Sequence, residues 1–88
     1  MQTMEMKIAA QSHPAKVGRA IVHVLQEGNT VILTGIGAGA VNVMTKALII
    51  AQQQFDSTPI QYRPAFTTVE VADRGKVVAI QWTIQTMA

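Results

Sequence analysis

Basic residues at helical spacing are the first feature of this sequence that could do chemistry. Lys16, Arg19 and His23 are separated by three and four residues, so on a helix they would share one face. Such a stripe can contact nucleic-acid phosphates, which supply affinity and register but no choice of sequence. Lys46 would reinforce the stripe if it lay nearby. The alternative interpretation is an ordinary solvated helix face, and the spacing alone leaves both open.

A glycine-rich segment is the second candidate. Residues 35–40 are Gly-Ile-Gly-Ala-Gly-Ala and precede a predicted helix, whose first backbone N–H groups could hold a phosphate. The segment is a poor dinucleotide-binding fingerprint, because Ala40 stands where G-x-G-x-x-G requires glycine, and it lacks the G-K-[ST] of a P-loop. The alternative is structural: Gly35, Gly37 and Gly39 would permit tight strand–helix packing or a subunit contact.

A predicted hairpin carries the third candidate set, Arg63, Arg74 and Lys76. The tip of such a hairpin could enter a nucleic-acid groove, as extended β arms do. Asp73 lowers the local positive field beside Arg74. Charges on an exposed strand also discourage aggregation, and that role alone would explain the residues at the tip.

Catalytic and metal-binding chemistry find little support in the sequence. His13 and His23 are ten residues apart, there is no cysteine, and no G-x-S-x-G elbow occurs. The spacing between the two histidines is too long for both to ligate one ion from adjacent turns of a helix. We therefore expect a non-enzymatic protein without a metal or a cofactor.

Composition narrows the class of partner and the compartment. A net charge of +2 is too small for a histone-like polyelectrolyte, so the position of the charges matters more than their sum. The absence of cysteine fits a reducing interior. Residues 1–10 lack the pattern of a signal peptide, and the longest strongly apolar stretch, residues 47–51, is far below the roughly 20 residues of a membrane span. The sequence predicts one cytoplasmic domain over residues 1–88, with no membrane partner.

Hydrophobic periodicity predicts the elements that must position these residues. Alternation indicates strands, and apolar residues at i, i+3, i+4 and i+7 indicate helices. We expect strands at residues 4–10, 30–34 and 60–71, the last interrupted at Pro64; helices from a cap at Ser12 or His13 to Glu27 and over residues 40–54; and a final strand carrying Val78, Ile80, Trp82 and Ile84. Turns are predicted at residues 56–59 and 73–75.

The order β-α-β-α-β-β predicts a two-layer α+β domain with a four-stranded mixed sheet and both helices on one face. The second helix has a wide apolar arc that reaches Ile49, which favours burial in a subunit contact. Aromatic residues are few, and Phe55 and Trp82 fall on apolar faces, so a base-stacking platform on an open sheet is disfavoured.

Three stretches resemble the stage V sporulation protein S family. Residues 35–42, Gly-Ile-Gly-Ala-Gly-Ala-Val-Asn, followed by Lys46-Ala47, are similar to its central I-G-A-G-A-[LV]-N-x-x-x-K-A segment. Residues 64–67, Pro-Ala-Phe-Thr, resemble its P-A-F segment, and Ser12-x-Pro-x-x-Val17 resembles its first helix. The resemblance covers nearly the whole chain in the right order.

This resemblance implies an Alba-like fold, association with nucleic acid, dimers or higher oligomers such as tetramers, and a regulatory part in sporulation or related development. Archaeal Alba proteins carry arginines in the loop entering the second helix, whereas this chain has Ala38 and Ala40. That difference removes charge from a surface that the resemblance implies is used for binding.

Together these observations predict a protein that binds DNA or RNA through its phosphates. The contact residues expected are Lys16, Arg19, Lys46, Arg63, Arg74 and Lys76, with Gly35, Gly37 and Gly39 shaping the loop. One rival is an interaction or assembly module that oligomerises through the second helix and the Gly-Ala loop. Another is a sensor of a small anion or nucleotide that uses that loop.

Overall fold

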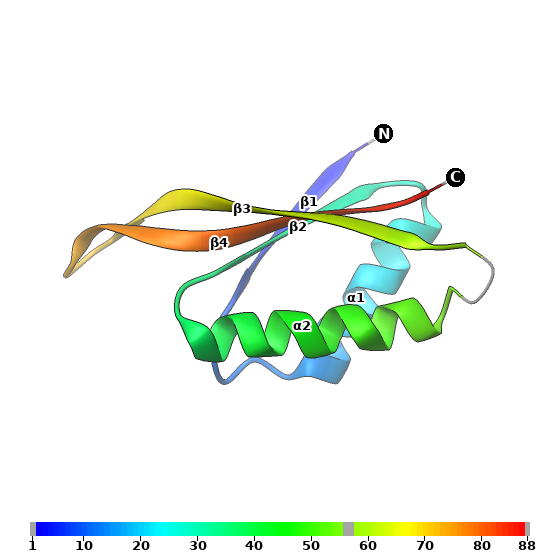
Figure 1. Cartoon of the computed structure of the whole chain (residues 1–88), viewed down its shortest axis with the longest axis horizontal. Coiled ribbons are helices and arrows are strands. Elements are labelled where there is room, and N and C mark those ends of the chain that lie inside the picture. Colours follow the sequence, from blue (N-terminus) through cyan, green and yellow to red (C-terminus); the bar gives the residue numbers. More distant parts are fainter. Residues whose placement is uncertain (1, 56–57, 88) are drawn as a thin grey trace.

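A computed structural model describes residues 2–55 and 58–87, and it places two helices against one face of a mixed sheet (Figure 1). The elements are β1 (Thr3–Ile8), α1 (Pro14–Gln26), β2 (Thr30–Gly35), α2 (Ala38–Gln53), β3 (Ile60–Val71) and β4 (Gly75–Thr86). The strand order is β1-β2-β4-β3, with β1 and β2 parallel and the other neighbours antiparallel. The predicted two-layer α+β architecture and its β-α-β-α-β-β order are confirmed.

The core lies between the sheet and the helices. Val31 and Leu33 of β2 pair with Ile84 and Trp82 of β4, and all four are buried. Because side chains alternate along a strand, these residues share one face, and the intervening positions form the opposite, open face. Met44 of α2 is fully buried against this layer. Each strand thus separates the residues that hold the fold from those that meet solvent.

The strand β3 passes through Pro64 without a break, which corrects the predicted interruption. Pro64 pairs with Trp82 in a continuous antiparallel register. The strand lies at the edge of the sheet, where a residue without an N–H group is tolerated because it has a neighbouring strand on only one side.

The helix starts decide what the sequence left open. Of the two predicted caps, His13 is the N-cap of α1, and it makes no side-chain capping hydrogen bond. The Ser12 hydroxyl oxygen instead accepts a hydrogen bond from the Ala9 N–H (2.9 Å), which tightens the turn after β1. Helix α2 begins at Ala38, two residues earlier than expected, so Gly39 lies in its first turn. The predicted turn at residues 56–59 lies partly outside the described residues.

Part of the β3–β4 hairpin extends past the other strands. Strand β2 pairs with β4 only from Ile80 to Ile84, whereas β3 and β4 stay paired as far as Val71 and Gly75. Residues 67–79 therefore form a two-stranded projection, the hairpin arm (Figure 1).

Among the described residues, neither helix has the length and apolar character required to cross a bilayer.

Gly35 allows β2 and α2 to pack closely. A Cβ atom at this position would lie 2.7 Å from Met44 Sδ and 2.9 Å from Ala40 Cβ. Both distances are below normal carbon contact, and Ala40 is fixed to the helix backbone. Tight strand–helix packing is therefore a sufficient reason for glycine at this position.

Replacing Gly35 with alanine should lower the free energy of unfolding by about 1–3 kcal/mol, because the added methyl group overpacks this contact. Urea denaturation followed by circular dichroism would measure the change. Ala65→Val adds carbon at an exposed strand position and should alter stability by less than about 0.5 kcal/mol. A Gly35→Ala protein as stable as the parent would contradict the packing argument.

Candidate nucleic-acid interface

The outer surface of the two helices carries three of the predicted cations. Lys16 and Arg19 are exposed on α1, as is His23. Gly18, next to Arg19, packs against Ile50 of α2: a Cβ atom there would lie 2.9 Å from Ile50 Cγ2. Arg19 therefore lies beside the crossing of the two helices.

Lys46 lies on the same outer surface. It is exposed and precedes Ile50 by one helical turn, so it projects from the side of α2 that borders α1. A groove of about 330 Å³ between the helices is lined in part by Arg19, His23 and Ile50. We call Lys16, Arg19 and Lys46 the helix-layer cations. Within the part of the chain that the structure describes, none of the three is held in an ion pair, so all three are available to an anionic partner.

The N-termini of both helices add positive potential. Neither α1 nor α2 has a side-chain capping hydrogen bond or an acidic residue in its first turn, so the positive end of each helix dipole is not neutralised locally. Gly37, the N-cap of α2, has φ of 88°, a conformation that favours glycine. The glycines of the sequence pointed to the α2 terminus but not to the α1 terminus, whose signal is the absence of an acid after Pro14.

Gly39 brings the two helix entrances together. A Cβ atom on Gly39 would lie 2.7 Å from Ala10 Cβ in the loop that leads into α1. The first turn of α2, this loop and the hairpin arm all lie at the same end of the molecule (Figure 1). Gly35 and Gly39 of the Gly-Ala segment are thus packed against other residues of the same chain. The exposed part of the segment is the N-terminus of α2, at Gly37 and Ala38.

The tip of the hairpin arm is close to neutral. Arg74 lies in the turn and Lys76 in the first residues of β4, but Lys76 pairs across the strands with Glu70, and Asp73 precedes Arg74. The two cations therefore contribute less long-range field than the helix-layer cations do.

Arg63 lies on the other side of the sheet. It pairs with Thr83, whereas its neighbours Tyr62 and Pro64 pair with the buried residues Ile84 and Trp82. Alternation along β3 therefore places Arg63 on the open face. The structure does not bring it together with the helix-layer cations.

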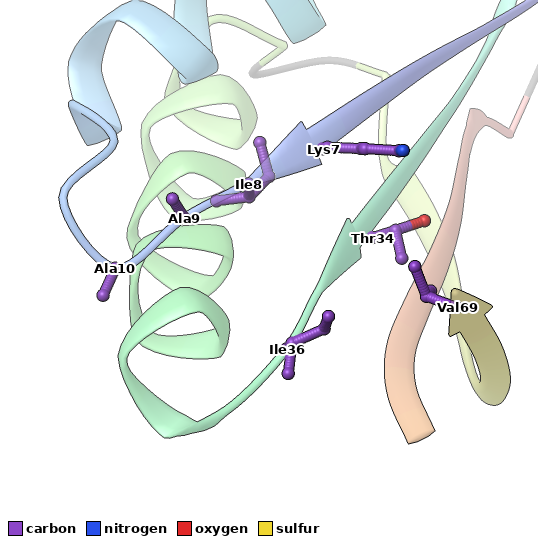
Figure 2. Close-up of a pocket in the computed structure, with 7 residues that line it drawn as sticks. All are labelled: Lys7, Ile8, Ala9, Ala10, Thr34, Ile36 and Val69. Atoms are coloured by element: carbon purple, nitrogen blue, oxygen red, sulfur yellow. The ribbon is translucent and has the colours of Figure 1, made fainter. Parts of the chain in front are cut away.

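Lys7 also lies on the open face, although it was not among the contact residues expected from the sequence. It pairs with Thr34 of β2, and both line a hollow of about 250 Å³ at the ends of the parallel strands (Figure 2). The signal was the alternation of β1: Met6 and Ile8 face the helices, so Lys7 must face away from them.

The aromatic residues of the strands all belong to the helix side of the sheet. Tyr62 and Trp82 lie with ring centroids 5.0 Å apart and planes tilted by 46°. Phe66 pairs with Ile80 on the same side. The expected core position of Trp82 is confirmed, and the positions of all three on one side argue against base stacking on the open face.

An exposed apolar surface borders α2 and the hairpin. Phe66 is 79% exposed and Val78 63%, although both are large apolar side chains. Ile49 and Tyr62 are also exposed, and they line a groove of about 310 Å³ between α2 and β3. We call Ile49, Tyr62, Phe66 and Val78 the apolar patch. Large apolar side chains that are left this exposed commonly mark a protein contact.

Two comparisons with known proteins agree with this architecture. The family model described as Stage V sporulation protein S (SpoVS) matches residues 4–87. Among solved structures, Alba from Thermoplasma volcanium is similar with a TM-score of 0.55 and 14% sequence identity, over 93% of this chain and 94% of that one. At this identity the second comparison shows the fold alone, and the predicted Alba-like fold is confirmed.

A negative charge at the start of α2 tests the potential at that terminus. Ala38 is exposed at the first helical position, so Ala38→Glu should raise the free energy of unfolding by about 0.3–1 kcal/mol at low salt. Ala38→Gln is the neutral control, and urea denaturation at low and high salt is the measurement. An equal gain with glutamine, or a gain that persists at high salt, would contradict the dipole argument.

Proposed function

The chain belongs to the stage V sporulation protein S family, and from this premise we propose that it is a non-enzymatic, cytoplasmic regulatory protein that binds DNA or RNA through phosphates. The proposed biological setting is sporulation or a related developmental process. The helix-layer cations and the two helix N-termini form the main contact surface, and the hairpin arm carries Arg74 and Lys76 toward a neighbouring part of the nucleic acid.

The observation that carries this proposal is the coincidence of cations and helix termini that have no acidic partner. Lys16, Arg19 and Lys46 are exposed on one surface, and both helices begin without an acid in the first turn. Phosphate groups bind well to such arrangements, because lysine and arginine supply charge and the terminal N–H groups supply donors. Since these contacts read no base edges, the proposed binding has little sequence preference.

Two copies of the chain strengthen this proposal. One protomer has a net charge of only +2, so the few phosphates that it can bind give modest affinity. A homodimer doubles the number of phosphates bound along one nucleic acid, and the apolar patch supports such an assembly. Covering a side chain as exposed as Phe66 removes apolar area from water at a gain of roughly 25 cal/mol per Å².

The second candidate function is an assembly module without nucleic acid, and the apolar patch is the observation that favours it. Ile49 of α2 and Phe66 of β3 would then form the contact with another copy or with a regulatory protein. The Gly-Ala loop contributes less to this alternative than the sequence suggested, because Gly35 and Gly39 pack within the protomer.

Neutralising the α1 cations should weaken nucleic-acid binding. For Lys16→Ala/Arg19→Ala, the slope of log affinity against log salt should fall in magnitude by about 0.9 for each duplex phosphate that the variant no longer neutralises. Fluorescence anisotropy with labelled duplex DNA, single-stranded DNA and RNA across a salt series would measure this slope. Lys7→Ala/Arg63→Ala removes the same charge from the open face and is the matched control.

Equal weakening by the two double variants would argue against a contact surface on the helices. Absence of binding by the parent protein at micromolar concentration and low salt would overturn the proposed function and favour the assembly module. Ala38→Glu provides an independent check, since it should weaken binding while the fold becomes more stable.

A charge in the apolar patch should dissociate the proposed dimer. Phe66→Asp places a carboxylate where the second copy would cover the ring, so sedimentation equilibrium should show a shift from dimer to monomer with an unchanged circular dichroism spectrum. Ala65→Asp, the adjacent residue on the open face, should leave the dimer intact. A parent protein that is monomeric at high micromolar concentration would contradict dimerisation.

A further inference from the structure

The open face of the sheet holds a second candidate site, separate from the proposed nucleic-acid surface. We propose that the hollow beside Lys7 and Thr34 binds a small monoanion with an aliphatic body, of which a short branched carboxylate is the simplest example. The hollow measures about 250 Å³ and lies at the ends of the two parallel strands (Figure 2). This inference does not depend on nucleic-acid binding.

Hydrogen-bond donors form a row across the open face at this point. Lys7 of β1 pairs with Thr34 of β2, and Thr34 pairs with Gln81 of β4. An ammonium group, a hydroxyl and an amide are therefore adjacent on one face of the sheet. Figure 2 shows the Lys7 side chain extending from β1 toward β2 on the same side as the Thr34 hydroxyl. A carboxylate above Thr34 could accept hydrogen bonds from this row.

The rest of the hollow is apolar. Ile36 and Val69 close it toward the hairpin arm, and Ala9 and Ala10 line it beyond the end of β1 (Figure 2). The polar backbone atoms of Ala9 already have partners: its N–H donates to Ser12 Oγ (2.9 Å), and its carbonyl accepts from the Ser12 N–H (3.0 Å). This segment therefore offers the ligand apolar surface, which suits an aliphatic group.

The charge of the site favours a monoanion over a phosphate. Among the described residues, Lys7 is the only cation that lines the hollow. It can balance one negative charge, so the second charge of a dianion would lie against apolar walls without a partner. Glu5 lies two residues before Lys7 on the same face, and it lines an adjoining hollow of about 450 Å³ that Lys7 and Thr34 also border. Its carboxylate would repel a second negative charge on the ligand.

Titration of isotope-labelled protein with isovalerate, followed by amide chemical shifts, tests the proposal. Shifts should be confined to residues around the hollow, with a Kd on the order of 1 mM for a ligand of this size. Lys7→Gln should weaken binding about fivefold and Thr34→Val about twofold, whereas Lys7→Arg should largely retain it. Arg63→Gln removes a cation from the same face outside the hollow and should have no effect.

Isovaleramide, the uncharged counterpart of isovalerate, and inorganic phosphate complete the test. The proposal is overturned if the amide or phosphate binds as tightly as isovalerate, if Lys7→Gln binds normally, or if isovalerate causes no localised shifts. The carboxylate could belong to the C-terminus of a peptide chain or to a free carboxylic acid, and binding of N-acetyl-leucine distinguishes these two sources. Tighter binding of this compound identifies the carboxyl terminus of a peptide chain, and weaker binding identifies a free carboxylic acid.

Discussion

At Gly35 the strand β2 approaches helix α2 so closely that one added methyl group would meet both Met44 and Ala40. This contact fixes the height of α2 above the sheet, and Gly18 fixes the approach of α1 to Ile50 in the same way. With both helices held against one face, the large side chains Ile21, Leu33 and Met44 are fully buried between the layers. Close packing leaves little freedom at these positions, because protein interiors have few voids to absorb an extra group.

The two-layer arrangement also divides the chemistry of the molecule between its faces. The helices bury one side of the sheet and carry Lys16, Arg19 and Lys46 on their outer surface, while the strands leave Lys7 and Arg63 on the opposite side. Cations that are mixed in the sequence are thereby separated by the thickness of the fold. Each face can therefore meet a different partner, and a net charge of +2 describes neither face well.

The hairpin leaves apolar side chains uncovered where it extends past the other strands. Its inner strand, β4, is held by β2 over only part of its length, so the arm projects with Phe66 and Val78 uncovered near its base. The same alternation that buries Trp82 beneath the helices exposes Phe66 beyond them, since both belong to one side of the sheet. Large apolar side chains that remain exposed in a protomer commonly mark a site of contact with another protein.

The sequence by itself determined the order of elements and the separation of core from surface, because alternation and helical periodicity are local consequences of backbone geometry. It also placed Trp82 in the core and Lys16 and Arg19 on an exposed helix face. Only the tertiary structure decided that β3 continues through Pro64, that Arg63 and Lys7 lie opposite the helices, and that the Gly-Ala segment packs on Met44 and Ala10. These features depend on which strands are neighbours and how closely layers approach, and such long-range contacts leave no periodic signal in the chain.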